Sequence, residues 1–91
     1  MTVKTEQVLF SGRVQGVGFR WTTESIARGF AVTGSVRNLP NGQVELTVQG
    51  EAAEINGLID AIRQRFQRNI DGCERQELAE NTEYSDFRIR R

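Results

Sequence analysis

The stretch Val8–Phe30, VLFSGRVQGVGFRWTTESIARGF, changes its residue pattern in the middle. From Gln7 to Val14, apolar residues alternate with the others, which is typical of a strand with one buried face. From Phe19 onward, the pattern follows the spacing of one helix face, at Phe19, Thr23, Ile26, Ala27 and Phe30. The stretch therefore predicts a strand, a glycine-rich loop and a helix, in that order.

The rest of the chain predicts a hairpin, a second helix and a less regular end. Two alternating runs, at residues 32–36 and 44–49, flank an Asn-Gly pair, which is a strong signal for a β-hairpin. A second helix is predicted by apolar residues at helical spacing, at Ile55, Leu58, Ile59, Ile62 and Phe66. The segment after residue 70 alternates only weakly, so it predicts either two short strands or one strand and a loop, with Phe87 and Ile89 buried.

The predicted order is strand, helix, strand, strand, helix, strand, within a chain of 91 residues that suffices for one domain, 1–91. This order is typical of an α+β fold, the ferredoxin-like sandwich, with two helices on one face of an antiparallel sheet of four to five strands. A right-handed crossover makes the second strand parallel to the first, so both end at the same edge of the sheet. We therefore expect Asn38, which ends the second strand, to lie near the loop of residues 12–20.

The composition excludes several kinds of partner and site. Twelve basic and twelve acidic side chains give a net charge of zero, so no overall field attracts nucleic acid or an anionic membrane. The single cysteine, Cys73, excludes an internal disulfide and a multi-cysteine zinc site, and histidine is absent. Because no segment is typical of a signal peptide or a membrane span, we expect a cytoplasmic location. We also expect a monomer that holds no metal and no cofactor.

The glycine-rich loop does not match the two standard nucleotide-binding patterns. A Walker A loop would need glycine at Val17 followed by Lys-Ser or Lys-Thr, and a dinucleotide fingerprint from Gly16 would need glycine at Trp21. We assign Trp21 to the core or its rim, with no catalytic role.

The loop is nevertheless suited to an anion. Glycines allow backbone N–H groups to converge, and a helix N-terminus adds free donors and a partial positive charge. Arg20 is unfavourable in the first helical turn unless an anion binds beside it, and a phosphate would accept its planar guanidinium fork. The spacing alone leaves a second interpretation open, in which the glycines form a tight turn and Arg20 is a solvated surface residue.

Three segments resemble the acylphosphatase family over nearly the whole chain: GRVQGVGFR at 12–20, GSVRNLPNGQVELTVQG at 34–50 and YSDFRIR at 84–90. The resemblance implies a ferredoxin-like sandwich that hydrolyses acyl phosphates to a carboxylate and inorganic phosphate, with phosphate as a competitive inhibitor. It also implies that Arg20 binds the phosphate and that Asn38 orients the attacking water. The loop backbone would cradle the phosphate at Gln15, Gly16, Val17, Gly18 and Phe19.

This reaction suits a chain without histidine. The leaving group is a carboxylate, which is stable as an anion at neutral pH, so no general acid is required. Phosphoryl transfer depends mainly on positioning and charge stabilisation, which backbone donors and Arg20 would supply without a metal. The proton of the attacking water can pass to the bound phosphate.

Two other functions are weighed against this one. A nucleic-acid-binding module of the same topology would expose aromatic residues on its sheet, but the outward positions of the third strand are polar: Gln43, Glu45, Thr47 and Gln49. A catalytically weak or regulatory acylphosphatase-like module, or part of a larger carbamoyl-phosphate-using protein, would bind an anion without useful turnover. The presence of both Arg20 and Asn38 argues against it.

Overall fold

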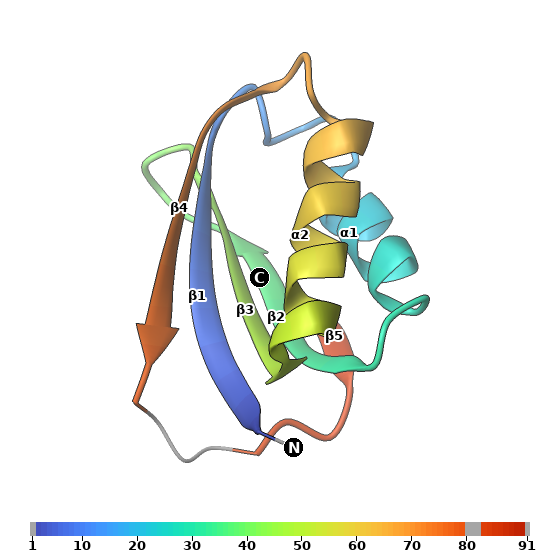
Figure 1. Cartoon of the computed structure of the whole chain (residues 1–91). Coiled ribbons are helices and arrows are strands. Elements are labelled where there is room, and N and C mark those ends of the chain that lie inside the picture. The colour runs from blue at the N-terminus through green and yellow to red at the C-terminus, as the bar shows by residue number, and fades with distance from the viewer. Residues whose placement is uncertain (1, 80–82, 91) are drawn as a thin grey trace.

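The computed structural model describes residues 2–79 and 83–90. Its elements are, in chain order, β1 (Val3–Gly12), α1 (Phe19–Ala27), β2 (Val32–Asn38), β3 (Val44–Glu51), α2 (Ala52–Arg65), β4 (Ile70–Leu78) and β5 (Phe87–Arg90). Both helices lie on one face of a five-stranded sheet (Figure 1). The ferredoxin-like order is therefore confirmed, and the segment after residue 70 forms two strands rather than one.

The strands lie in the order β4-β1-β3-β2-β5. Because β3 pairs antiparallel with both β1 and β2, those two strands run in the same direction and end at the same edge of the sheet, as predicted. β5 pairs parallel with β2, which makes the sheet mixed at this side. An antiparallel sheet was the sequence prediction, and the parallel addition was missed because alternation within a strand does not specify its neighbour or direction.

One hydrophobic core fills the space between the sheet and the helices. The alternating residues of β1 and β3 and the helical face of α2 supply most of it, as their periodicity predicts. Its largest fully buried members are Phe10, Phe19, Leu46, Ile55, Leu58, Ile59 and Ile62. Burying one such side chain stabilises the fold by about 1.5–3 kcal/mol relative to leaving it in water.

Helix α1 is shorter than its sequence pattern predicts. It ends at Ala27, and Phe30 lies beyond it, packed against the core and close to Gly57 of α2. A Cβ added at Gly57 would lie 2.5 Å from the Phe30 ring. Glycine at this position costs about 1 kcal/mol in helix propensity, and it lets Phe30 pack directly against α2, since a larger residue would require the ring to shift.

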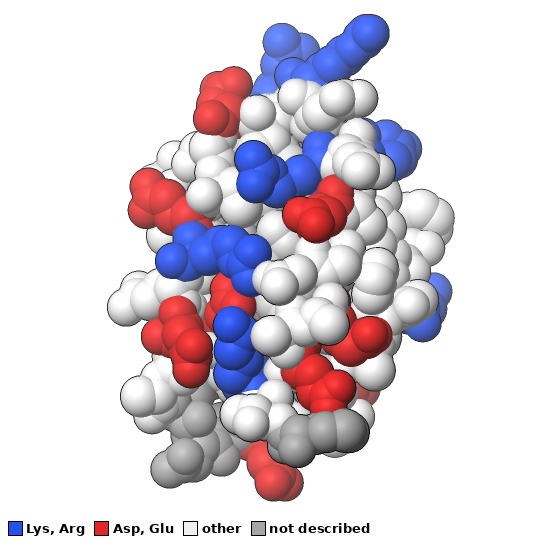
Figure 2. All heavy atoms as spheres, in the orientation of Figure 1, with Lys and Arg blue, Asp and Glu red and all other residues white. Residues whose placement is uncertain are grey.

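Charged side chains of both signs are mixed over the face seen in Figure 2, without a single basic patch. This distribution matches the net charge of zero and gives no support to a nucleic-acid interface on that face. In the described part of the chain, neither helix has the length and apolar character that crossing a membrane requires.

An ion pair between a buried carboxylate of β1 and an arginine of β4 also reaches α2 through a hydrogen bond. Glu6 is only 3% exposed, and Arg75 donates to its two carboxylate oxygens at 2.8 and 2.9 Å. Arg75 also donates to Oδ1 of Asn56 in α2, and the Lys4 ammonium lies 3.1 Å from Glu6. The hydrogen bond from Arg75 lowers the pKa of Glu6 below its ordinary value, although burial opposes this shift.

Substitution of Glu6 should change how stability depends on pH. Because the folded-state pKa is depressed, the carboxylate stabilises the fold above its unfolded pKa of about 4.3, and this contribution is lost as pH falls through the folded-state pKa. For Glu6→Gln we expect a lower Tm at pH 7 and a smaller decrease in Tm between about pH 5 and pH 3. Thermal unfolding followed by circular dichroism measures both quantities.

The matched control is Glu77→Gln, which removes the same charge from the neighbouring strand at a side chain that is 66% exposed. It should leave the pH dependence of Tm nearly unchanged, because exposed ion pairs contribute little. If the curves of Glu6→Gln and the unsubstituted protein ran parallel from pH 7 to pH 3, the assignment to Glu6 would be wrong.

Candidate active site

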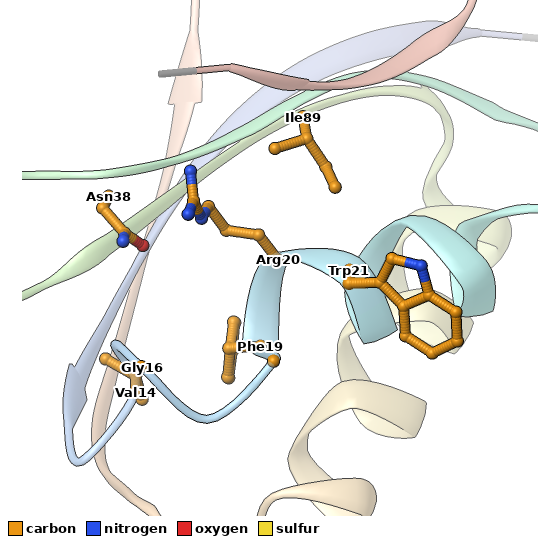
Figure 3. A pocket seen from close by; sticks show the side chains of 8 residues that line it. Val14, Gly16, Phe19, Arg20, Trp21, Asn38 and Ile89 are labelled. Atoms are coloured by element: carbon orange, nitrogen blue, oxygen red, sulfur yellow. The ribbon is translucent and has the colours of Figure 1, made fainter.

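A pocket of about 170 Å³ lies at the edge of the sheet where β1 and β2 end. It is lined by residues of the β1–α1 loop, α1, β2 and β5: Val14, Gly16, Gly18, Phe19, Arg20, Trp21, Asn38 and Ile89. Figure 3 shows the Arg20 side chain reaching from the start of α1 toward Asn38 at the end of β2. The predicted proximity of Asn38 to the glycine loop is therefore confirmed.

The loop backbone requires glycine at two positions. Gly16 has φ 77° and Gly18 has φ 76°, in the left-handed region that other residues adopt at a cost. A Cβ at either position would meet no atom within 4 Å. The requirement therefore comes from backbone conformation and not from lack of space.

This loop presents a series of free backbone donors. Within residues 2–79 and 83–90, no N–H group of residues 15–20 donates to a backbone carbonyl. The first N–H groups of a helix have no partner inside the helix, and here Gly18 precedes α1 without a side-chain cap. Such donors beside an arginine are typical of an anion site.

Two apolar side chains hold the loop in place. Val14 and Phe19 are buried, and the Phe19 ring lies 5.2 Å from that of Phe10 and 4.6 Å from that of Phe66, measured between centroids. Phe19 was predicted to contribute its backbone to a phosphate cradle. Its side chain has a second role, because it fixes the start of α1 and so the position of Arg20.

The Gln15 side chain connects the loop to the β2–β3 hairpin. Its Nε2 donates to the carbonyl oxygens of Leu39 at 2.8 Å and Gln43 at 2.9 Å. Leu39 directly follows Asn38, so Gln15 ties the loop to the segment that carries Asn38. The sequence predicted only a backbone contribution from Gln15, because these partners lie 24 and 28 residues away.

The Arg20 side chain also forms a hydrogen bond with the last strand. Its Nη1 donates to the carbonyl oxygen of Arg90 in β5 at 3.3 Å. Among the described residues, no carboxylate forms an ion pair with Arg20. Its charge is therefore not neutralised within that part of the chain, and it is directed into the pocket.

The predicted site residues do not all line this pocket. Gly16, Gly18, Phe19, Arg20 and Asn38 do. The side chain of Gln15 points instead to the hairpin, and Val17 is 40% exposed outside the lining.

Sequence reasoning missed Val14, Trp21 and Ile89 as lining residues. A signal existed for Trp21, since it directly follows Arg20, but none existed for Ile89, which reaches the pocket only because β5 pairs with β2. Among the described residues, no cluster of three or more His, Cys, Asp or Glu side chains is placed to hold a metal ion.

Comparison with known proteins places this geometry in a family. The Acylphosphatase family model matches residues 6–89. An acylphosphatase of Marinobacter nauticus is 40% identical over 89 residues, covering 97% of each chain.

Solved structures agree with this match. An acylphosphatase from Coxiella burnetii superposes with a TM-score of 0.83 at 32% identity, over 97% of this chain and 93% of that one. The HypF protein of T. kodakarensis also matches 97% of this chain, with a TM-score of 0.84 and 27% identity, but over only 12% of its own length. The chain therefore belongs to the acylphosphatase family, and it is an enzyme that hydrolyses acyl phosphates.

Proposed function

We propose that the pocket at the edge of the sheet is the active site, with the phosphoryl group held by the loop and Arg20 and the attacking water oriented by Asn38. One observation carries the proposal: free backbone donors, an arginine and an asparagine from separate elements line one small pocket. The phosphate cradle consists of the backbone of Gln15, Gly16, Val17, Gly18 and Phe19, together with Arg20.

The cradle is suited to a doubly charged phosphoryl group. Backbone N–H groups and the guanidinium of Arg20 offer donors from several directions, and arginine binds phosphate oxygens through two parallel hydrogen bonds. An anion at this place also removes the unfavourable interaction between Arg20 and the positive end of α1. Because the loop is anchored through Val14 and Phe19, little reorganisation is needed as charge develops in the transition state.

The reaction proceeds by attack of water on phosphorus. The amide of Asn38 accepts a hydrogen bond from the water, whose oxygen forms the new P–O bond while the bond from phosphorus to the acyl oxygen breaks. The electron pair of that bond leaves on the carboxylate. Arg20 is the only ionisable side chain among the described residues that line the pocket, so the water's proton passes to the phosphate.

Two finer properties of the reaction follow from the same site, and three properties of the protein remain to be tested. Inorganic phosphate presents the same oxygens as the substrate, so we infer that it inhibits competitively. We also infer that no metal takes part, since Arg20 supplies the positive charge. A single domain over 1–91, supported by one core cluster, a monomeric state and a cytoplasmic location stay predictions.

A catalytically weak, mainly anion-binding member of the family is the alternative weighed against this proposal. This fold also occurs as one part of a much longer protein, but the presence of both Arg20 and Asn38 in the pocket lining favours the catalytic role. Turnover of acetyl phosphate or benzoyl phosphate, beside a phosphomonoester control and without added metal, distinguishes the two candidates.

Removal of the Arg20 guanidinium should abolish turnover. An arginine that acts on a transferring phosphoryl group contributes about 10³ to 10⁵ in rate, so we expect a loss of that size in Arg20→Ala. Arg20→Lys should also be severely impaired, because lysine lacks the planar fork. Benzoyl phosphate hydrolysis measures both variants, and Arg13→Ala, at an exposed arginine outside the pocket lining, should retain activity. Nearly unchanged turnover in Arg20→Ala would refute the assignment.

Asn38→Ala should separate water activation from phosphate binding. We expect kcat to fall at least about a hundredfold, which is the usual effect of losing one catalytic hydrogen-bonding group, while competitive inhibition by inorganic phosphate persists. Asn56→Ala, in α2 and outside the pocket lining, is the control and should keep its kcat, although it loses a hydrogen bond with Arg75. If phosphate inhibition disappeared together with activity, Asn38 would support the loop instead of the water.

Gln15→Ala should lower kcat through Asn38. Its two hydrogen bonds stabilise the fold by about 1 kcal/mol each, so we expect a decrease of a few degrees in Tm. Because the segment that carries Asn38 is then held less firmly, we also expect kcat to fall roughly tenfold. In a double-mutant cycle the same change should have little further effect on kcat of Asn38→Ala, because Gln15 acts on the reaction only by positioning Asn38.

Gln7→Ala is the matched control, since Gln7 also uses its amide in a partly buried hydrogen bond, to Glu45. It should keep full activity. Fully additive losses of Gln15→Ala and Asn38→Ala would show that Gln15 does not position Asn38.

A further inference from the structure

The pocket has an apolar flank that the roles proposed above do not use. Trp21 and Ile89 both line it. Figure 3 shows them on one side of the Arg20 side chain, with Asn38 on the other. Ile89 packs against the core from β5, so this flank has a fixed base.

The indole of Trp21 has no evident role in the fold. It is 69% exposed, whereas the buried face of α1 consists of Phe19, Thr23 and Ala27. Trp21 lies two positions after Phe19 and so outside that face. Of the large apolar side chains exposed in the described part of the chain, Val3, Val17 and Trp21, only Trp21 lines the pocket.

We propose that Trp21 and Ile89 bind the acyl group of the substrate, and that this protein prefers acyl phosphates whose acyl group is aromatic or otherwise large and apolar. The inference rests on the proposed function. In phosphoryl transfer, the attacking and leaving oxygens lie roughly in line on opposite sides of phosphorus. With water at Asn38 and the phosphoryl group at Arg20, the leaving carboxylate points toward Ile89 and Trp21.

This flank matches the chemistry of an aromatic acyl group. An exposed indole face offers offset stacking or edge-to-face packing to a second ring, and it loses contact with water when covered. An acetyl group is too small to cover much of it. The difference between the two substrates should therefore depend on Trp21.

The test compares kcat/KM for benzoyl phosphate and acetyl phosphate in Trp21→Ala, Trp21→Phe and the unsubstituted protein. For Trp21→Ala we expect a decrease of about five- to twentyfold with benzoyl phosphate and less than about twofold with acetyl phosphate. Trp21→Phe retains a ring and should recover most of the preference. Val3→Ala, at another exposed apolar residue, 63% exposed and outside the pocket lining, is the control and should change neither value. If Trp21→Ala lowered both values equally, or neither, the proposal would be wrong.

A binding measurement separates this proposal from the catalytic one. Trp21 is the only tryptophan in the sequence, so its fluorescence reports contact at the flank. Benzoylphosphonate and acetylphosphonate lack the hydrolysable bridging oxygen and differ only in the acyl group. We expect a saturable change in emission and about tenfold tighter binding with benzoylphosphonate. Such binding without turnover of either acyl phosphate would count against the catalytic roles alone, whereas equal affinities for the two phosphonates would overturn the acyl-group proposal.

Discussion

The antiparallel pairing of β3 with both β1 and β2 is the interaction on which the site depends. It makes β1 and β2 parallel in direction, so that the loop after β1 and the last residue of β2 meet at one edge. The inward side chains of β3, Val44, Leu46 and Val48, are fully buried. Hydrophobic burial therefore fixes the register, since a shift of one residue would expose this whole face to water. Arg20 and Asn38 are brought together as a consequence.

In the loop, side chains and backbone have separate tasks. Val14 and Phe19 are buried in the core, and Gln15 is bonded to the hairpin, while the backbone N–H groups between them stay free of backbone partners in the described part of the chain. Binding an anion through backbone groups needs no particular side chain at Gly16 or Val17. It needs a rigid conformation, which the left-handed glycines permit and the anchors maintain.

The pocket combines a polar end with an apolar flank. The donors and Arg20 match the phosphoryl group that all acyl phosphates share, so they cannot distinguish one acyl phosphate from another. Trp21 and Ile89 line the flank where we propose that the acyl group binds, and selectivity among acyl groups would arise there, from apolar contact. The size of that selectivity is limited, since one small apolar contact is worth only a few kcal/mol.

The sequence by itself determined most of the elements and the glycine loop that leads into Arg20, because both are local. A buried face imposes a period of two or 3.6 residues, and glycines and Arg20 are adjacent in the chain. The helical spacing wrongly predicted that α1 includes Phe30, which lies beyond the end of the helix and packs near Gly57. Only the tertiary structure decided the parallel position of β5, the bonds from Gln15 to the hairpin, the contact of Arg20 with Arg90 and the approach of Ile89 to the pocket. The bonds of Gln15 and Arg20 join residues 24 to 70 positions apart, and all four features depend on which segments pack together, which no local pattern specifies.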